Sequence, residues 1–396
     1  MQPTIRRRAL PAAVLGVLVA SAVLAGPEAG AERPRGAPEP LARIVKSKKI
    51  APGLVYTKII EKKIPRRTYV LRIDLRKALT LDVTLSRPQL PARRVLSEVV
   101  RQADALAGVN GDYGGNAGRP VHPLAQDGDL LQTTDQLGTL FGLTRDESST
   151  VFGKPTLAVT VTDRSTDRVF TLDRWNEGAP APGEIAGFSP LGGTLESPPT
   201  FGCGVRLLPV TEPTASSGDG VDQDFTVDVA QCSEEPLTRD GGVVLSAAPA
   251  TDEATQLLAL APGTPMRLHW TFGWTNVFDA IGGAPLLLLD GALTGQCNSG
   301  CGRQPRTGVG VTATGRILLV VVDGRQAKWS LGPTMDEFAR IMRDLGAVSA
   351  LNLDGGGSSA MVVDGEVVNR PSDGHERSIS SALLVLPGAD PGEPPA

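Results

Sequence analysis

The sequence is poor in aromatic side chains, which make up 4% of its 396 residues. A core with so few rings must be mainly aliphatic, and a hydrophobic content of 41% can supply it. Positive charge is not in excess either, because the formal net charge is −4. This balance gives no electrostatic footprint for nucleic acid, so we expect no nucleic-acid partner.

Two common catalytic signatures are missing. The sequence has no Gly-x-Ser-x-Gly nucleophile elbow, which argues against an ordinary α/β-hydrolase, and no Gly-Lys-Ser/Thr of a P-loop. Histidine is scarce, and His122 and His269 are isolated in the sequence. We therefore expect both of these histidines to be structural.

Long apolar runs are confined to the N-terminus. Three arginines at positions 6 to 8 precede an apolar stretch, Ala9 to Ala25, and Ala29-Gly30-Ala31 follows as a small-residue cleavage site. This order is typical of a secretory signal peptide, and an uncleaved membrane anchor is the alternative. We expect a secreted or extracytoplasmic protein with no stable membrane insertion after cleavage of the signal.

Cysteine is limited to four residues, which in an exported chain predicts two disulfides. Cys297 and Cys301 are spaced to close a small loop, and Cys203 would then pair with Cys232. Three connectivities are open at this point. A zinc site is the competing interpretation, but the sequence lacks a second close cysteine pair and a histidine cluster.

Glycine and proline are abundant, with 46 and 32 residues, and they favour many turns and loops. Ser216 to Asp224 in the middle of the chain resembles a long loop, and the predicted fold class is α+β. It has a mixed β-sheet core, a βαβ-like unit in the C-terminal third and a loop-rich middle insertion. The predicted parts are a signal peptide (1–31), a Pro-rich linker (32–43), a strand-rich N-terminal part (44–145), a loop-rich middle region or insertion (146–275), a C-terminal part (276–386) and a disordered tail (387–396).

The C-terminal third has the clearest pattern. Ile317 to Val322 is a continuous apolar run, as expected for a strand buried on both faces. Thr334 and Glu337 form a capping box that predicts a helix, and Val348 to Leu353 predicts the next strand. If the two strands are parallel, Asp323 and Asp354, which follow them, lie at the same edge of a sheet.

Three consecutive glycines, Gly355 to Gly357, follow Asp354 and precede Ser358. Glycines lose much backbone entropy on folding, so such a run indicates positive φ angles or a ligand close to the main chain. An acid, hydroxyls and bare backbone N–H groups make a polar-ligand site, and a structural bend with polar caps is the alternative. Acids and arginines also cluster at other strand ends, as suits an anionic, oxygen-rich ligand.

Six motifs of the sequence share one pattern of acids, amides, arginines and glycines: Val109-Asn-Gly-Asp-Tyr113, Pro305 to Gly310, Val322-Asp-Gly-Arg325, Leu351 to Ser359, Val368 to Gly374 and Glu376-Arg377. Taken together, these motifs resemble the phosphodiester glycosidase family. The resemblance covers about residues 105 to 386, so that 276–386 would be the C-terminal part of a phosphodiester glycosidase domain. The family often has a second aromatic residue after the position of Tyr113, where this chain has Gly114.

The resemblance implies hydrolysis of the bond between the anomeric carbon of a sugar and a phosphodiester oxygen. Asp354 and Glu376 are the candidates for nucleophile or general base, and Arg325 and Arg377 for holding the phosphate. Asn110 and Asn352 would orient substrate hydroxyls. The full substrate-binding set that we expect is Asn110, Asp112, Arg306, Asp323, Arg325, Asn352, Gly355, Gly356, Gly357, Ser358, Asn369 and Arg377.

We expect no metal-binding residues in this set and no required cofactor, although a structural or catalytic divalent cation fits any of the interpretations. One rival function is a metal-dependent phosphodiesterase that acts at phosphorus, with Asp323, Asp354 and Asp373 holding the ion. The other is a non-catalytic glycan-binding protein of the cell envelope. The expected partner is a sugar phosphodiester of an envelope or secreted glycan, by analogy alone. The abundance of Ala, Arg, Gly and Pro is typical of GC-rich bacterial genomes.

Overall fold

The structure is a computed structural model that describes residues 43–114, 117–134, 136, 138–199, 202–294, 297 and 300–388. The expected signal peptide lies outside the described residues, as do the expected linker except for its last residue and the tail beyond residue 388. All of the described residues fall in one compact unit, Leu41–Ala396.

The described residues form 27 strands but only three α-helices and two 3-10 helices, so the fold is mainly β. The predicted α+β class is therefore wrong. None of the helices in this part of the chain has the length and apolar character of a membrane span. The helices are α1 (Leu96–Gln102), α2 (Asp252–Leu258), α3 (Met335–Asp344), η1 (Pro190–Gly192) and η2 (Gly356–Ser358).

An eight-stranded antiparallel sheet carries apolar side chains on both faces. In its strand Ile317–Val322, alternate residues belong to two different core clusters, so the prediction of burial on both faces is confirmed. Helix α3 covers one face, because Phe338 and Met342 pack in the same cluster as Leu318. The sheet order is β1 (Arg43–Ala51), β2 (Leu54–Glu61), β3 (Arg66–Ile73), β23 (Ile317–Val322), β22 (Arg306–Thr312), β24 (Ala347–Asn352), β20 (Leu286–Leu289) and β21 (Ala292–Leu293).

Helix α3 begins where the sequence predicts. The Thr334 hydroxyl accepts a hydrogen bond from the Glu337 N–H at 3.2 Å, and the Glu337 carboxylate accepts one from the Thr334 N–H at 3.3 Å. This reciprocal capping box satisfies two N–H groups that the first turn leaves free. Gly346, with φ of 100°, ends the helix in the left-handed region.

The βαβ-like unit expected around α3 does not form from neighbouring strands. β22 lies between β23 and β24 and is antiparallel to both. The physical reason is that β22, which precedes β23 in the sequence, forms hydrogen bonds with β23 on one side and with β24 on the other. Because both strands run opposite to β22, their C-terminal ends still reach the edge of the sheet where β22 begins.

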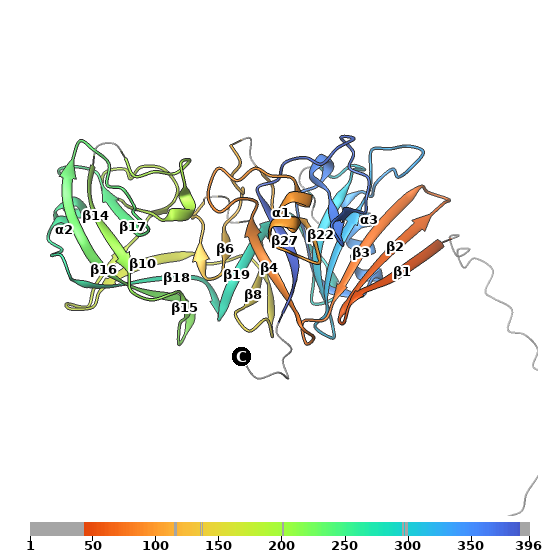
Figure 1. Ribbon diagram of the computed structural model, residues 1–396, viewed down its shortest axis with the longest axis horizontal. Helices are drawn as coiled ribbons and strands as arrows, with labels where there is room; N and C mark the ends of the chain where they lie inside the picture. Colours follow the sequence, from red (N-terminus) through yellow and green to blue (C-terminus); the bar gives the residue numbers. More distant parts are fainter. Residues whose placement is uncertain are drawn as a thin grey trace, which may run out of the picture. The chain divides into compact units, whose positions relative to one another are not determined.

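The middle region, expected to be loop-rich, forms a nine-stranded sheet, drawn mainly in yellow and green in Figure 1. Its longest strand, Asp219–Ser233, includes most of the Ser216 to Asp224 segment that resembled a loop. Polar residues on the exposed face concealed the strand pattern, while Val221, Phe225 and Val227 point into the core. The sheet order is β11 (Arg168–Thr171), β10 (Ala158–Asp163), β18 (Pro265–Thr275), β16 (Asp219–Ser233), β14 (Gly202–Pro209), β17 (Val243–Ala247), β13 (Ile185–Phe188) and β12 (Arg174–Trp175), with β15 (Thr214–Ala215) paired to β16.

Two five-stranded sheets complete the fold. In one of them, β4 pairs with β27 from the far end of the sequence, and Figure 1 shows the two strands side by side. One sheet has the order β7 (Asp129–Leu130), β6 (Leu124–Gln126), β19 (Val277–Gly283), β8 (Thr139–Thr144) and β9 (Thr150–Gly153). The other has the order β26 (Glu366–Val367), β25 (Met361–Val363), β5 (Ala107–Asn110), β27 (Ser381–Pro387) and β4 (Leu79–Leu85).

Candidate active site

The candidate site lies where the eight-stranded sheet meets the five-stranded sheet of β5 and β27. β22 begins at Arg306, β24 ends at Asn352 and β5 ends at Asn110. The chain that leaves β24 joins the two sheets, because the Asp354 N–H donates a hydrogen bond to the Gly111 carbonyl at 3.0 Å. Strand ends that are far apart in the sequence thus converge on one place.

Asn110 is fully buried and acts as a connector behind the site. Its Oδ1 accepts hydrogen bonds from the Thr307 hydroxyl at 2.8 Å and from the Ala360 N–H at 3.1 Å. Its Nδ2 donates to the Asp354 carbonyl at 2.8 Å. With its polar atoms engaged in this way, Asn110 fixes the backbone of Asp354 and does not itself line the cavity.

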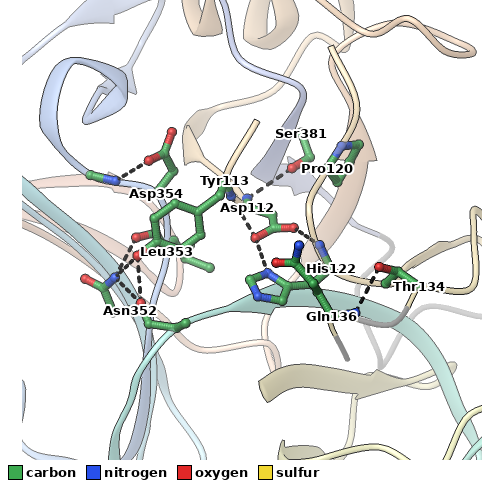
Figure 2. Close-up of polar contacts among 12 residues, drawn as sticks. Asp112, Tyr113, Pro120, His122, Thr134, Gln136, Asn352, Leu353, Asp354 and Ser381 are labelled. Atoms are coloured by element: carbon green, nitrogen blue, oxygen red, sulfur yellow. Dashed lines mark hydrogen bonds and ion pairs between the residues drawn. The ribbon is translucent and has the colours of Figure 1, made fainter. Parts of the chain in front are cut away.

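Asn352 is also fully buried, and it holds Tyr113. Its Nδ2 donates to the Tyr113 hydroxyl at 2.7 Å and to the Ala284 carbonyl at 2.6 Å, and the Tyr113 hydroxyl donates to the same carbonyl at 2.7 Å. Figure 2 shows Asn352 on the far side of the Tyr113 ring from Asp112. Asn352 therefore acts on the cavity through the position of this tyrosine.

The glycine loop is packed against charged side chains. Gly356 has φ of 62°, in the region that favours glycine, and a Cβ there would lie 3.1 Å from the guanidinium nitrogens of Arg325. A Cβ on Gly357 would collide with the Asp373 carboxylate and the Arg377 guanidinium. The glycines thus leave room for two of the arginines that the sequence singles out.

Asp354 presents a carboxylate whose ionisation is shifted toward neutral pH. Burial raises its pKa to about 6, against hydrogen bonds from Ser358 and from the Gly355 N–H, the latter at 2.8 Å, which lower it. The nearby Asp112 carboxylate raises the pKa further, and Arg377 lowers it. A carboxyl group that loses its proton near pH 6 suits acid–base or nucleophilic chemistry.

Two arginines of the site bond to neutral oxygens. Arg306 is almost fully buried, and its Nη2 donates to the carbonyls of Gly300 at 2.5 Å and Gly302 at 2.8 Å. Arg325, with φ of 59°, donates from Nη2 to the Gln304 side-chain oxygen at 2.9 Å. Neither has a carboxylate within ion-pair distance in the described part of the chain. Burial lowers the pKa of Arg306, and Arg325 nearby lowers it as well.

The cavity in front of these residues has a volume of about 550 Å³, within the range of ligand sites. A second compartment of about 620 Å³ adjoins it, since Tyr113, Asp354 and Arg377 line both. Together the compartments form one cleft, which we call the arginine cleft. Its first compartment is also lined by Arg306, Arg325, His122 and the three glycines, and its second by Ser358, His375, Glu376 and Ser380.

Glu376 lines the second compartment, but its carboxylate is engaged. Both of its oxygens accept hydrogen bonds from Ser97 in the first turn of α1, from the N–H at 2.9 Å and from the hydroxyl at 2.5 Å. An anionic side chain at a helix N-terminus is favourable there. Arg377, next in the sequence, pairs with Asp373 at 2.6 Å.

Asp323 and Asn369 lie beneath the cleft and do not line either compartment. The buried Asp323 carboxylate accepts hydrogen bonds from the Tyr69 hydroxyl at 2.9 Å, the Trp329 indole at 2.7 Å and the Arg370 N–H at 3.0 Å. Burial raises the pKa of Asp323, and the hydrogen bonds oppose that shift. Asn369 donates to Asp323 at 3.2 Å, so this pair ties the loop of Arg370 to the end of β23.

Asp112 makes contacts that the sequence does not reveal. Its side chain has no solvent exposure, and its Oδ1 lies 2.7 Å from Nδ1 of His122. Its carboxylate also accepts hydrogen bonds from the N–H groups of His122 at 2.8 Å and Tyr113 at 2.7 Å (Figure 2). The imidazole of His122 lines the first compartment, which places a histidine in the cleft.

Sequence reasoning missed Tyr113 and His122 as lining residues. Tyr113 stands in a motif that we quoted for the resemblance, so that signal was present. His122, expected to be structural, lies ten residues beyond Asp112 with no local pattern that connects them. Their contact is set by the turn between β5 and β6.

Buried polar atoms without a hydrogen-bond partner gather around the cleft. In the described ranges there are five such side-chain atoms, and four belong to the segments that build the cleft: Arg306 Nε, Asn352 Oδ1, Ser359 Oγ and Ser380 Oγ. Each such atom costs free energy in a native protein and calls for an explanation. Ser380 and Arg306 line the compartments, as expected where a polar ligand completes the site.

The described residues offer no group of three or more His, Cys, Asp or Glu side chains placed to hold a metal ion. The three aspartates of the rival metal site are not gathered in one place: Asp323 bonds to Trp329, Asp373 pairs with Arg377, and Asp354 lines the cavity. Cysteine instead forms two disulfides, Cys203–Cys232 and Cys297–Cys301, so the prediction of two bridges is confirmed and the connectivity is settled. The second bridge ends at Cys301, between Gly300 and Gly302, whose carbonyls hold Arg306.

Comparison with known proteins agrees with this geometry. Residues 219–386, which contain Arg306, Arg325, Asp354 and Arg377, match the model of the phosphodiester glycosidase family. The resemblance to this family is confirmed over that segment. The match begins in the middle sheet and ends in β27, so the residues contributed by β5 and the following turn lie outside it.

Short segments of the chain also match two curated proteins. The chain is 38% identical over 68 residues to mouse N-acetylglucosamine-1-phosphodiester alpha-N-acetylglucosaminidase, covering 17% of this chain. It is 35% identical over 83 residues to the prophage-derived protein YomE of Bacillus subtilis, covering 21% of this chain. The matched segments span only 13% of the length of each of these two relatives.

The fold is shared more widely than the sequence. A crystal structure from Burkholderia pseudomallei, of a protein described as exported, superposes with a TM-score of 0.62 at 20% identity. The similarity covers 88% of this chain and 97% of the other. At this identity the likeness establishes the fold alone.

Proposed function

We propose that this protein is an exported glycosidase that hydrolyses the anomeric C–O bond of a sugar-1-phosphodiester, releasing the sugar and a phosphomonoester. One observation carries the proposal: Arg306 and Arg325 face the same cavity as Asp354, and neither has an ion-pair partner in the described structure. Guanidinium groups that lack carboxylate partners suit phosphate oxygens, which they can grip with two hydrogen bonds. The match of residues 219–386 to the family supports the same assignment.

The leaving group explains why arginines should matter here. A phosphomonoester leaves as a stable anion, so it needs less help from a general acid than the alcohol that leaves in ordinary glycoside hydrolysis. Positive charge that is fixed near the phosphate stabilises the charge that develops as the bond breaks. We assign this work to Arg306 and Arg325, with Arg377 at the boundary of the two compartments.

Asp354 is the carboxylate that we place at the anomeric carbon. With a pKa of about 6 it is mostly ionised at pH 7, and it can act there as a nucleophile or as a base toward water. Glu376 was expected to share this role, but Ser97 occupies both of its oxygens. We therefore propose that Glu376 positions α1 and the Arg377 loop.

Export and substrate class are part of the same proposal. The two disulfides suit an oxidising compartment, and the structural neighbour from Burkholderia pseudomallei is described as exported. The mouse relative is named for a sugar-1-phosphodiester. We propose that the substrate is a sugar phosphodiester of an envelope or secreted glycan and that no cofactor is required.

The experiment that tests the proposal is hydrolysis of a small panel of sugar-1-phosphodiesters in 18O-labelled water, with and without chelator. The phosphate product is read by mass spectrometry, because the anomeric oxygen of a free sugar exchanges with water. Unlabelled phosphate is expected, since cleavage at the anomeric carbon leaves all phosphate oxygens in place. Labelled phosphate would move the chemistry to phosphorus and overturn the proposal. Loss of activity with chelator, with the phosphate unlabelled, would overturn only the part that no cofactor is required.

A further inference from the structure

We infer that Asp112 and His122 form a proton-transfer pair in the arginine cleft, with His122 as the general base toward water; the inference rests on the proposed function. Nδ1 of His122 lies 2.7 Å from Oδ1 of Asp112, and both side chains are buried. The Asp112 carboxylate is itself fixed by N–H groups of His122 and Tyr113. A carboxylate that orients an imidazole in this way is a recurring arrangement in general acid–base catalysis.

The carboxylate determines which ring nitrogen carries the proton. An ionised carboxylate can only accept hydrogen bonds, so Nδ1 of His122 must be the N–H that donates to Asp112. Nε2 is then left with a lone pair, and in the described part of the protein no side chain or backbone group bonds to it. In Figure 2 this nitrogen is turned away from Asp112. His122 lines the same compartment as Asp354, and we assign this lone pair to the cleft.

The imidazole is held in place by packing as well as by Asp112. A Cβ on Gly138 would lie 2.7 Å from Nε2, and a Cβ on Gly282 would overlap the His122 side chain. The Tyr113 ring packs edge-on, with ring centroids 6.1 Å apart and planes at 70°. Glycine at both positions therefore makes room for a ring in one orientation, as pre-organised catalytic groups require.

The step that this pair would serve is the attack of water. The water oxygen forms a bond to the anomeric carbon while one of its protons passes to Nε2 of His122. The bond between the anomeric carbon and the leaving oxygen breaks, and its electron pair stays on that oxygen. The leaving oxygen belongs to the phosphate in a single displacement, or to Asp354 if Asp354 first attacked the sugar. The imidazolium, stabilised by Asp112, then returns its proton to solvent.

A second histidine–aspartate pair serves as a matched control. Nδ1 of His269 lies 2.7 Å from Oδ1 of Asp222, the same distance as in the cleft. This pair lies on β18 and β16 of the nine-stranded sheet and lines neither compartment of the arginine cleft. Its histidine side chain is 28% exposed, compared with 8% for His122. The location in the cleft, not the pairing alone, distinguishes His122.

The test compares His122→Ala with His269→Ala on a sugar-1-phosphodiester that the wild-type protein hydrolyses. We expect His122→Ala to lower kcat by about 10²–10³-fold with little change in KM, as loss of a general base does. Added imidazole should restore part of kcat in this variant, because the vacated space can hold it. His269→Ala should keep wild-type kcat with or without imidazole. Full kcat in His122→Ala would overturn the inference, as would a loss that imidazole does not restore.

A second readout does not depend on turnover. The sequence has three histidines, so 15N-histidine labelling gives three pairs of imidazole nitrogen resonances, which the two variants assign. We expect the His122 proton on Nδ1 at pH 8, and a shift of its Nε2 resonance when inorganic phosphate and free sugar are added together. A proton on Nε2, or no response to these probes, would overturn the inference whatever the substrate. If the wild-type protein hydrolyses none of the panel, the proposed function is overturned. In that case, an Nε2 of His122 that carries no proton and responds to the probes would still support the pair as the proton acceptor of the cleft.

Discussion

In the described structure, the first compartment of the arginine cleft and a separate cleft are similar in size and opposite in charge. The first compartment of the arginine cleft, about 550 Å³, is lined by Arg306, Arg325 and Arg377 with a single carboxylate, Asp354. The other, which we call the acidic cleft, has about 590 Å³ and lies beside β4 and β19. It is lined by one arginine, Arg145, and by five carboxyl groups, those of Asp82, Asp127, Glu147, Glu212 and Asp279.

The two clefts differ in the charge state of the side chains that line them. In the arginine cleft, Arg306 and Arg325 bond to neutral oxygens, and no carboxylate among the described residues forms an ion pair with either of them. In the acidic cleft, burial first and neighbouring acids second raise the pKa of Asp82 to about 6, while burial raises that of Glu147 and Asp279 to about 7. These groups reduce their mutual repulsion by binding protons. Size alone would not distinguish the two, but only the first holds charge ready for a ligand.

The largest effect should come from removing charge from the arginine cleft. Arg325→Ala should lower kcat/KM by about 10²–10³-fold, because a fixed donor to the developing negative charge is lost. Its melting temperature should barely change, since Arg325 has no ion pair in the described structure to lose. Steady-state kinetics and thermal denaturation check both points. Asp279→Asn, in the acidic cleft, is the matched control and should change kcat/KM by less than about two-fold. An Arg325→Ala protein with wild-type kinetics would mean that phosphate is held elsewhere.

The two disulfides sharpen the same comparison, because only one of them touches the arginine cleft. Cys297–Cys301 flanks the carbonyls that hold Arg306, whereas Cys203–Cys232 joins β14 to β16 in the nine-stranded sheet. Replacing the first pair with serines should raise KM by about ten-fold, as a misplaced guanidinium weakens substrate binding. Replacing the second should leave KM unchanged.

The effect of the two disulfide replacements on stability should be in the opposite order to their effect on KM. The bridges span 4 and 29 residues, and loop-closure entropy assigns them roughly 2 and 3.6 kcal/mol, so the second replacement should lower the melting temperature more. Kinetics and calorimetry on both double variants separate the two effects. If both variants lose stability alike and neither changes KM, the Cys297–Cys301 loop does not position Arg306.

Local patterns predicted the parts of the fold that local interactions determine. The apolar run of β23 and the capping box at Thr334 were legible because each depends on residues within a few positions. β16 was not, because its alternation is interrupted by polar residues and its partners, β14 and β18, lie elsewhere in the sequence. The sheet formed by these partners is what turns the expected α+β fold into a mainly β one.

In the candidate site, too, some residues stand in local motifs and others are placed by contacts across the fold. Asp354 and the glycine loop stand in one motif that the sequence singles out, and the structure brings them into one cavity with arginines of the other motifs. Which of the polar residues reach the cavity depends on contacts across the fold. Asn110 and Asn352 donate hydrogen bonds to backbone carbonyls, and a hydrogen bond to Asp112 holds His122 at the cleft. Such assignments need the tertiary structure. Asp323 and Asp354 both follow strands of one sheet, but Asp354 lines the cavity whereas Asp323 bonds to Trp329.

The acidic cleft should make stability depend on pH. The pKa of Asp279 is about 7 in the folded protein against an ordinary value of 3.8, so above pH 4 the unfolded chain loses this proton before the folded protein does. The free energy of unfolding therefore falls between about pH 4 and pH 7 and stays lower above that range. Asp279→Asn should raise the melting temperature at pH 8 by roughly 2–4 °C and leave it unchanged at pH 4. An equal shift at both pH values, measured by calorimetry, would show that charge is not the cause.

The smallest effects should come from two glutamates that make the same kind of bond in the two clefts. Glu376 accepts a hydrogen bond from the Ser97 N–H at 2.9 Å, and Glu147 accepts one from the Leu81 N–H at 3.0 Å. Glutamine keeps an acceptor oxygen at each position, so Glu376→Gln should lower kcat/KM by no more than about three-fold. Glu147→Gln should leave kinetics alone and stabilise the protein at pH 8, because burial raises the pKa of this carboxyl to about 7. A loss of about 10³-fold in kcat/KM in Glu376→Gln would contradict this expectation, because it would make Glu376 a reacting carboxylate. The chemistry would then lie in the second compartment, and Asp354 would be the group that holds the phosphate-binding loop in place.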